Sequence, residues 1–193
     1  QSIALAAAGA EVRHVGKVNQ SDSAFKQTLI KHGIDCQFLQ CVEAPSGHAI
    51  IQVTPSGENA IVLFGGANQE IGSKEIMHAL DKARPSDWVL TQNETSGLAE
   101  TLQQAKQKHI KVAFNPAPMS ESVKSLPHEC IDLLIVNEVE AAELSGEREL
   151  DAIIEHYKTQ WSHAEVIITL GKAGVIMLKN QQTIQVDAFV VDA

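Results

Sequence analysis

Short apolar runs alternate with longer amphipathic stretches through the second half of the chain. The short runs are continuous and occupy residues 88–91, 111–115, 132–136 and 165–169. Helical spacing of apolar residues fills the intervals, at 96–108, 138–144 and 149–161. Continuous apolar runs bounded by helices indicate parallel strands buried on both faces. Because strands separated by helices imply right-handed crossovers, we predict an α/β fold with a doubly wound, mostly parallel sheet flanked by helices.

The first half of the chain departs from this alternation. A helix, a strand and a second helix are expected at 1–10, 12–18 and 22–31, with Ser21 or Asp22 as the cap of the second helix and Gly33 as its stop. Two β-rich runs then follow at 48–54 and 60–64 with no helix between them, and residues 55–59 suit a hairpin turn. We therefore expect a β-lid over about 45–65, inserted in one partial α/β domain over 1–193.

Both ends of the chain carry unfinished patterns. The apolar helix expected at 1–10 has no strand before it. At the other end, short strands are expected at 175–178 and 183–186, and a strand-like run at 189–191 is the last of them. These last strands predict an antiparallel edge of the sheet. A domain rarely finishes on a strand without a cap. We therefore expect the sequence to be an internal segment of a longer protein.

Composition narrows the functional classes. The 193 residues carry a formal net charge of −9 and no cluster of Lys and Arg, which argues against nucleic-acid binding. Apolar runs fall far short of the roughly 20 residues that a membrane helix needs, and no secretory signal is recognisable. The odd number of cysteines, at positions 36, 41 and 130, forms no metal-type pair. A reducing cytoplasm is the expected location.

Polar or glycine-bearing loops follow four consecutive strands. They contain Gln-Asn-Glu-Thr at 92–95, Asn-Pro-Ala-Pro at 115–118, Asn-Glu-Val-Glu at 137–140 and Thr-Leu-Gly-Lys-Ala-Gly at 169–174. In open α/β sheets, ligands bind outside the carboxyl ends of the strands. We therefore expect these four loops to lie along one edge and to form the functional site.

The chemistry of the last two loops suits phosphate. Glycines let backbone N–H groups approach an anion, and Thr169, Gly171, Lys172 and Gly174 fit that task. Asn137 can donate to a phosphate oxygen, whereas Glu140 beside a nucleotide implies Mg²⁺ or its water shell between the two. An ordinary alternative also exists, in which Asn137 is a helix N-cap and Glu140 its capping-box partner. Taken alone, the glycines at 171–174 are more typical of a plain hairpin turn.

The ordered motifs resemble the ribokinase family of sugar kinases (PfkB-type carbohydrate kinases). The resemblance rests on Gly-Ala-Asn at 66–68 and on the loops at 115–118, 137–140 and 169–174, whose order and spacing match through essentially the whole chain. Residues 45–51 and 57–61 resemble the lid strands of that family. The resemblance implies a ribokinase-like α/β body with a β-lid that mediates homodimerisation. It also implies transfer of the γ-phosphoryl group of ATP to a sugar hydroxyl, with Mg²⁺ as cofactor.

The resemblance also assigns roles to individual residues. Asn137 and Glu140 would position the triphosphate and its Mg²⁺, the latter through water. The nucleotide site would be lined by Thr169, Gly171, Lys172 and Gly174. Substrate contacts would come from Glu94, Ser46 and Gly47, and Asp192 would hold a monovalent cation such as K⁺.

The sequence departs from the pattern of the ribokinase family in several places. No catalytic residue lies in the chain, because the Gly-Ala-Gly-Asp segment with the general-base Asp is expected after Ala193. The glycine-rich sugar motif is expected before Gln1, and Asn-Gln-Ser-Asp at 19–22 replaces the usual Gly-Asp pair. We expect this segment alone to be inactive. Two functions stay open: an ATP-dependent kinase, with ribose preferred over another sugar or a nucleoside, or a non-catalytic sugar- or nucleotide-binding protein of the same fold.

Overall fold

A computed structural model describes residues 1–54 and 59–190 of the chain. Its internal contacts divide the chain into two compact units. Unit 1 comprises Gln1–Lys82 and Glu94–Gly97, and unit 2 comprises Ala83–Asn93 and Leu98–Ala193. None of the helices within the described residues has the length and apolar character that a membrane crossing requires.

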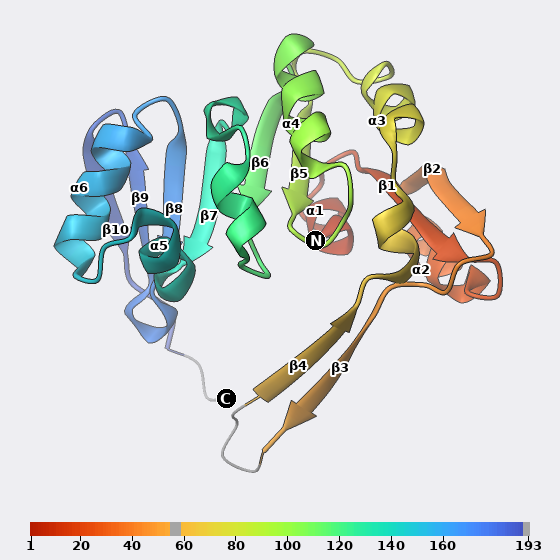
Figure 1. Ribbon diagram of the computed structural model, residues 1–193, viewed down its shortest axis with the longest axis horizontal. Coiled ribbons are helices and arrows are strands. Elements are labelled where there is room, and N and C mark those ends of the chain that lie inside the picture. The colour runs from red at the N-terminus through yellow and green to blue at the C-terminus, as the bar shows by residue number, and fades with distance from the viewer. Residues whose placement is uncertain (55–58, 191–193) are drawn as a thin grey trace. The chain divides into compact units, whose positions relative to one another are not determined.

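Unit 2 is built on a six-stranded sheet (Figure 1). Its strands are β5 (Trp88–Gln92), β6 (Lys111–Asn115), β7 (Leu133–Asn137), β8 (Glu165–Thr169), β9 (Val175–Lys179) and β10 (Gln182–Val186). Their spatial order is β10-β9-β8-β7-β6-β5. Strands β5 to β8 pair in parallel, whereas β9 and β10 add antiparallel neighbours at one end. The predicted mostly parallel sheet with an antiparallel edge is therefore confirmed.

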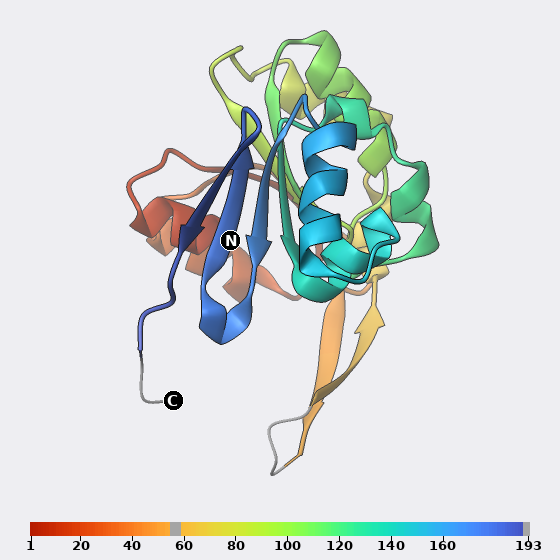
Figure 2. The same ribbon diagram turned by 90° about the vertical axis from the view of Figure 1, so that its left-hand side faces the viewer.

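The helices of unit 2 lie on one face of this sheet (Figure 2). They are α4 (Leu98–Gln107), α5 (Glu138–Ser145) and α6 (Leu150–Gln160), and short 3₁₀ turns occupy Glu121–Ser125, His128–Cys130 and Gly171–Ala173. The strand order from β5 to β8 runs in one direction, so successive right-handed crossovers place their helices on the same side. A buried tyrosine, Tyr157, joins two of these helices through a hydrogen bond from its hydroxyl to the carbonyl oxygen of Ala141 (3.2 Å).

The burial of strand residues reflects the position of these helices on one face of the sheet. In β7, β8 and β9 the buried residues alternate with half-buried ones. Leu134, Val136, Val166 and Ile168 are buried, while Ile135 and its neighbours on the other face are half-buried. The expected burial on both faces is confirmed for β6, where Val112, Ala113 and Phe114 are all buried. It is wrong for β7 and β8, because helices of unit 2 cover only one face of the sheet.

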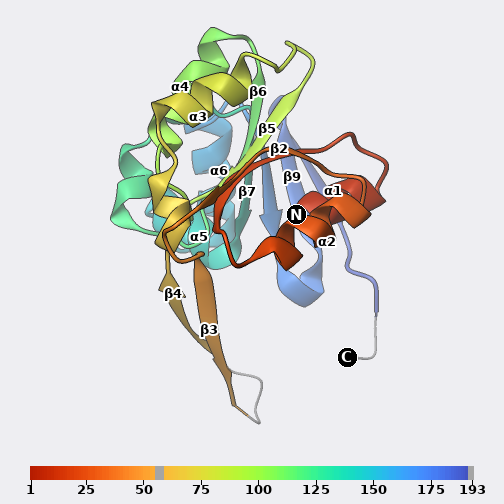
Figure 3. The same cartoon turned by 90° about the vertical axis from the view of Figure 1, so that its right-hand side faces the viewer.

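Unit 1 contains a parallel pair of strands with two helices (Figure 3). Its elements are α1 (Ser2–Ala7), β1 (Arg13–Asn19), α2 (Ser23–Lys31) and β2 (Asp35–Val42). A small core holds them together, formed by Val18, Leu29, Ile34, Cys36 and Leu39, with Ala6 and Val12 packed against it. The sequence analysis identified the first three elements and did not assign β2.

A β-hairpin projects from the rest of unit 1 (Figures 1 and 3). Strands β3 (His48–Val53) and β4 (Asn59–Phe64) pair antiparallel in the region of the predicted β-lid. Of the hairpin turn expected at 55–59, residues 55–58 lie outside the described residues, and residue 59 is the first residue of β4. A 3₁₀ turn, η1 (Gly66–Glu70), and helix α3 (Ser73–Leu80) follow the hairpin.

The C-terminal part differs from expectation in one place. Residues 187–190 form no strand, although a strand was expected at 189–191, and residue 191 lies outside the described part. Strong β propensity at Phe189 and Val190 does not by itself create a strand, because a strand also needs a hydrogen-bonding neighbour. Both side chains are exposed.

Candidate functional site

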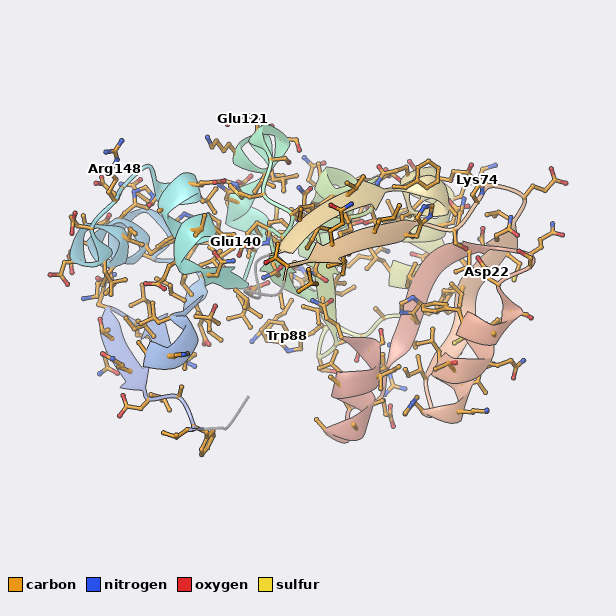
Figure 4. The ribbon with its side chains drawn as sticks, turned by 90° about the horizontal axis from the view of Figure 1, so that it is seen from below. Asp22, Lys74, Trp88, Glu121, Glu140 and Arg148 are labelled. Atoms are coloured by element: carbon orange, nitrogen blue, oxygen red, sulfur yellow. The ribbon has the colours of Figure 1, made fainter. Side chains whose placement is uncertain are left out.

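The carboxyl ends of the parallel strands in unit 2 bring the predicted polar loops to one edge. Gln92 of β5 is the register partner of Asn115 of β6, and Asn137 of β7 is the register partner of Thr169 of β8. Figure 4 looks onto this edge and labels Glu140 at the start of α5. The expectation that these strand ends line one edge is confirmed within unit 2.

Asn137 and Glu140 form a reciprocal capping box at the start of α5. The Asn137 side-chain oxygen Oδ1 accepts from the Glu140 backbone N–H (2.8 Å), and Glu140 Oε2 accepts from the Asn137 backbone N–H (3.0 Å). Each side chain uses one polar atom in the box. Within the described residues, Asn137 Nδ2 and Glu140 Oε1 have no hydrogen-bond partner. The capping box therefore orients one amide donor and one carboxylate oxygen that remain free to bind a ligand.

The loop after β8 is a tight turn whose bonds leave backbone donors free. The Leu170 N–H donates to the Gly174 carbonyl (2.8 Å), and Ala173 and Gly174 donate to the carbonyls of Leu170 and Gly171. Gly171 and Gly174 have φ values of +55° and +94°. In the part of the chain that the structure describes, the N–H groups of Gly171 and Lys172 donate to no acceptor. Such free amides next to a lysine suit an anion.

Gly174 also permits a close approach of two chain segments. A Cβ atom there would clash with the carbonyl oxygen of Val186 and would lie 2.8 Å from the backbone of Asp187 and Ala188. The chain leaving β10 therefore passes directly over this glycine, and only a residue without a side chain fits the position.

Asn115 links three strands at the same edge. Its Oδ1 accepts from Gln92 Nε2 (3.0 Å) and from the Ala117 N–H (3.2 Å), and its Nδ2 donates to the Ile135 carbonyl of β7 (2.8 Å). The β6–β7 pair has only two register partners, at Ala113 and Phe114, whereas β5–β6 and β7–β8 continue to their carboxyl ends. The Asn115 side chain thus spans the point where β6 and β7 diverge.

The residue after β5 fixes the loop that follows β6. The Asn93 side-chain Nδ2 donates to the Pro118 carbonyl (2.7 Å) and to Ser120 Oγ (2.9 Å), while its backbone N–H donates to the Ala117 carbonyl (3.1 Å). The peptide bond between Ala117 and Pro118 is cis. Two of the predicted polar loops, at 92–95 and 115–118, are therefore bonded to each other as well as adjacent.

Two of the predicted substrate residues, Ser46 and Gly47, lie in unit 1 just before β3. Ser46 Oγ accepts from the Asn19 N–H (2.8 Å) and donates to the carboxylate of Asp22. A Cβ atom on Gly47 would lie 2.5 Å from Asn68 Nδ2, so this glycine is packed against the turn that follows the hairpin. Both residues are half-buried.

Glu94, the third predicted substrate residue, also belongs to unit 1. Its backbone carbonyl accepts from Gln69 Nε2 (2.9 Å), and the residue is exposed. The structure therefore places Ser46, Gly47 and Glu94 in unit 1, and Asn137, Glu140, Thr169, Gly171, Lys172 and Gly174 in unit 2. Asp192, expected to bind a monovalent cation, lies outside the described residues.

Metal-binding chemistry at the edge is limited to single side chains. Among residues 1–54 and 59–190, no three His, Cys, Asp or Glu side chains gather closely enough to hold a metal ion. Mg²⁺ in nucleotide sites is usually held by one or two carboxylates together with substrate phosphates and waters. One free carboxylate oxygen, Glu140 Oε1, fits that arrangement.

The negative charge of Glu140, at the start of α5, also affects Tyr157 in α6. Burial raises the pKa of the Tyr157 hydroxyl, and the nearby negative charge of Glu140 raises it further. Tyr157 is therefore a neutral hydrogen-bond donor throughout the physiological pH range. Its bond to Ala141 helps to fix the first turn of α5, where Glu140 lies.

The profile of the pfkB family carbohydrate kinases matches residues 1–193, the whole chain. The chain belongs to the pfkB family of carbohydrate kinases. Among curated relatives of this pfkB-family chain, the ribokinase of Haemophilus influenzae is 34% identical over all of the chain, and the ribokinase of Staphylococcus aureus is 28% identical over all of it.

A solved structure gives the same result for the fold. The crystal structure of ribokinase from Cryptococcus neoformans var. grubii in complex with ADP is 25% identical and superimposes with a TM-score of 0.81 over 98% of the pfkB-family chain and 66% of that protein. The fold of the chain is therefore ribokinase-like α/β. The chain spans 66% of the length of both curated relatives named above.

Some residues of the site did not emerge from the sequence as individual participants. The loops at 92–95 and 115–118 were recognised as polar, but the bonds that Asn93 and Asn115 make between strands were not. Their only signal in the sequence is an amide side chain at or directly after a strand end. Amide side chains have both donors and acceptors, so they can replace backbone pairing where strands separate.

Proposed function

We propose that the protein containing residues 1–193 is an ATP-dependent sugar kinase that transfers the γ-phosphoryl group to a sugar hydroxyl, with ribose as the preferred substrate. The observation that carries the proposal is the register pairing of Asn137 with Thr169, which brings the family's nucleotide motifs to one edge of the sheet. Membership of the pfkB family supports the reaction class.

The nucleotide would bind through groups whose hydrogen bonds are still available. Asn137 Nδ2 and the amides of Gly171 and Lys172 would donate to phosphate oxygens, and the Lys172 ammonium would add a positive charge. Thr169 and Gly174 complete the lining proposed for this site. Phosphoryl transfer depends mainly on positioning and on stabilising negative charge, so preorganised donors of this kind are the expected contribution of the protein.

Mg²⁺ would be held near Glu140 through water and by the phosphates of ATP. The ion neutralises charge on the phosphate oxygens when bound. The role of this chain is then to hold Glu140 Oε1 in place, and the capping box does so by using Oε2 alone. The monovalent cation proposed for Asp192 concerns a residue outside the described part.

The sugar would bind through Glu94, Ser46 and Gly47. The only proton of the Ser46 hydroxyl is donated to Asp22, so toward a sugar hydroxyl Ser46 would act as an acceptor. The preference for ribose is supported by the names of the relatives from Haemophilus influenzae and Staphylococcus aureus. A deoxyribokinase from Salmonella typhi is also similar, at 27% identity, so the 2-hydroxyl of the sugar is the feature to test.

The catalytic base is proposed to lie outside residues 1–193. The relatives are longer than the chain, so this base can be supplied by residues outside it. We therefore also propose that residues 1–193 alone do not phosphorylate a sugar, because without the catalytic base the sugar hydroxyl would keep its proton. It also includes a cytoplasmic location, supported by three free cysteines.

A homodimer is proposed through hairpin β3–β4. Both faces of the hairpin expose large apolar side chains, namely Ile51, Ile61 and Leu63 on one face and Ile50, Val62 and Phe64 on the other. An isolated two-stranded hairpin is marginally stable in water, and exposed apolar strands gain by pairing with another surface. A second copy of the chain offers the same apolar hairpin.

The test is a coupled assay of ADP release by the full-length gene product that contains residues 1–193. Ribose, deoxyribose, fructose and a nucleoside are supplied separately with ATP and Mg²⁺. The proposal expects ribose to give the highest kcat/KM. Sugar binding without ADP release would instead favour a non-catalytic binding protein, and turnover restricted to another acceptor would overturn the assignment of ribose.

A further inference from the structure

The linker between β2 and β3 is tied to the turn that follows β1. Four long-range hydrogen bonds connect residues 43–46 with residues 19–22. All of them lie within unit 1. Because the linker leads directly into the hairpin, these bonds fix the point at which β3 leaves the strand pair.

Asp22 bonds to the linker and does not cap its own helix. It occupies the N-cap position of α2, where an aspartate normally accepts a hydrogen bond from the first turn of its own helix. Its side chain makes no such bond in this chain. The carboxylate accepts instead from Ser46 Oγ in the linker. Figure 4 labels Asp22 at this end of α2.

Asn19 contributes both its backbone and its side chain. The backbone N–H donates to Ser46 Oγ (2.8 Å), while Nδ2 donates to the carbonyls of Glu43 (2.9 Å) and Ala44 (3.1 Å). Its Oδ1 accepts from the backbone N–H (2.9 Å) and hydroxyl (2.6 Å) of Ser21, which fixes the rotamer of the amide. One side chain thus holds the turn and the linker together.

The opposite side of the linker is held by the turn after the hairpin. The Ala67 N–H donates to the Pro45 carbonyl (2.8 Å), and Gly66, with φ of +48°, lies so close to Pro45 and Ser46 that a Cβ atom would clash with their backbone. Ser46 and Gly47 are therefore fixed from two sides, while the strands of the hairpin pair mainly with each other.

We infer that Asn19 and Asp22 are positioning residues that hold the 43–47 linker, and through it Ser46 and Gly47, in the geometry required for sugar binding. The inference rests on the proposed function for the meaning of that geometry. Neither residue needs to touch the sugar. Asp22 fixes the direction of the Ser46 hydroxyl proton, which leaves the second lone pair of Ser46 Oγ as the group available to a ligand.

The experiment compares variants of the full-length gene product that change one bond at a time. Asp22→Ala removes the acceptor for Ser46, and Asp22→Asn restores an acceptor oxygen of the same shape. Asn19→Asp removes the donors to Glu43 and Ala44 while keeping the oxygen that Ser21 uses. Thr28→Ala is the matched control, since its hydroxyl bonds only within α2, to the Ala24 carbonyl.

Two measurements separate positioning from general stability. Hydrogen exchange of the Asn19 amide, which donates to Ser46 Oγ, should accelerate about tenfold in Asp22→Ala and recover in Asp22→Asn. The KM for the sugar should rise about five- to tenfold in Asp22→Ala and Asn19→Asp, with the KM for ATP unchanged. Thr28→Ala should change neither quantity.

Several outcomes would overturn the inference. Unchanged exchange of the Asn19 amide in Asp22→Ala would show that Asp22 does not hold Ser46. Equal increases in both KM values, accompanied by a lower melting temperature, would show a general structural role. A wild-type protein without sugar-dependent turnover would contradict the proposed function instead, and calorimetric sugar binding to the same variants would then decide the inference, with unchanged affinity counting against it.

Discussion

Asn137 and Thr169 are register partners at the carboxyl ends of β7 and β8, so the two loops that carry the nucleotide motifs begin side by side. This pairing is set by the strand ladder and not by the loops themselves. Loops that begin on adjacent parallel strands share an edge whatever their own conformation. The nucleotide site is therefore placed by the most regular part of unit 2.

Replacement of Glu140 separates its capping role from its charge. Glu140→Gln keeps an oxygen that can accept from the Asn137 N–H, so the free energy of unfolding should change by less than about 0.5 kcal/mol. The loss of charge should nevertheless reduce kcat/KM for Mg-ATP about tenfold or more in the full-length protein. Glu140→Ala should in addition cost about 1 kcal/mol of stability through loss of the cap.

Urea unfolding and steady-state kinetics of the two variants check this prediction. If Glu140→Gln turned over Mg-ATP as fast as the wild-type protein, Glu140 would be a helix cap only. The capping box would then account for the whole of the pattern at 137–140.

A side chain at Gly174 should be much less tolerated than one at another left-handed glycine. Gly174→Ala must accommodate both φ of +94° and the clash with the Val186 carbonyl. Gly146 ends α5 with φ of +78° and has open space around it, so Gly146→Ala isolates the backbone cost of about 1–2 kcal/mol. We expect Gly174→Ala to lower the melting temperature more than Gly146→Ala does. Equal decreases would contradict the close approach of the chain at this site.

The elements that sequence periodicity predicted best are those with continuous apolar strands. The runs at 111–115 and 165–169 became β6 and β8 with the predicted bounds. In β6 the uninterrupted apolar run reflects burial on both faces. In β8 it includes half-buried positions such as Ile167. Strand β2 was not assigned, since it has no continuous apolar run. Exposed and buried residues alternate at its start, where Cys36 and Phe38 are buried, as is typical of a half-buried strand. Helix α3 was not assigned either, and its first turn is held to β1 by the ion pair between Lys17 and Glu75.

The ion pair between Lys17 and Glu75 should make stability depend on pH. Lys17 Nζ lies 3.0 Å from Glu75 Oε1 and also donates to the Glu70 carbonyl (2.6 Å), so it fastens the start of α3 to β1. The hydrogen bond from Lys17 holds the pKa of the Glu75 carboxyl below its usual value. A lowered pKa in the folded state means that the stabilisation is complete above the unfolded pKa of about 4.3 and is lost as the pH falls through the folded value.

Glu75→Gln should therefore cost about 0.5–1 kcal/mol at pH 7, and the difference from the wild-type protein should shrink below about pH 4. Glu121→Gln is the matched control, since the exposed pair of Glu121 with Lys124 should contribute little. Urea denaturation at pH 3 and pH 7 measures both variants. A Glu75→Gln deficit that stayed constant with pH would show that its effect is not electrostatic.

The hairpin should govern self-association. Ile51→Glu places a charge on one face of the hairpin and Val62→Glu on the other, and each wild-type side chain is more than half exposed. If a second copy covers one of these faces, burying the new charge there becomes unfavourable. At least one variant should shift the full-length protein from dimer to monomer in sedimentation velocity. A wild-type monomer at high micromolar concentration would contradict the proposed dimer.

Site prediction from the sequence succeeded where position along a strand decides location and failed where side chains bond across the fold. Asn137 and Thr169 follow predicted strands, so the parallel ladder was enough to bring them together. The partnership of Asp22 with Ser46 joins residues 24 positions apart and replaces the expected helix cap, so no local pattern reveals it. Local spacing cannot specify such bonds, because they depend on how β1 and β2 pair.

The most direct test of the account is a titration of the full-length protein with Mg-ADP, followed by ¹H–¹⁵N NMR of assigned backbone amides. We expect the largest saturable shifts to fall on Asn137, Gly171, Lys172 and Gly174, and we expect Asn137→Leu to abolish them while the protein stays folded. Saturable shifts confined to residues away from the carboxyl ends of β7 and β8 would contradict this expectation.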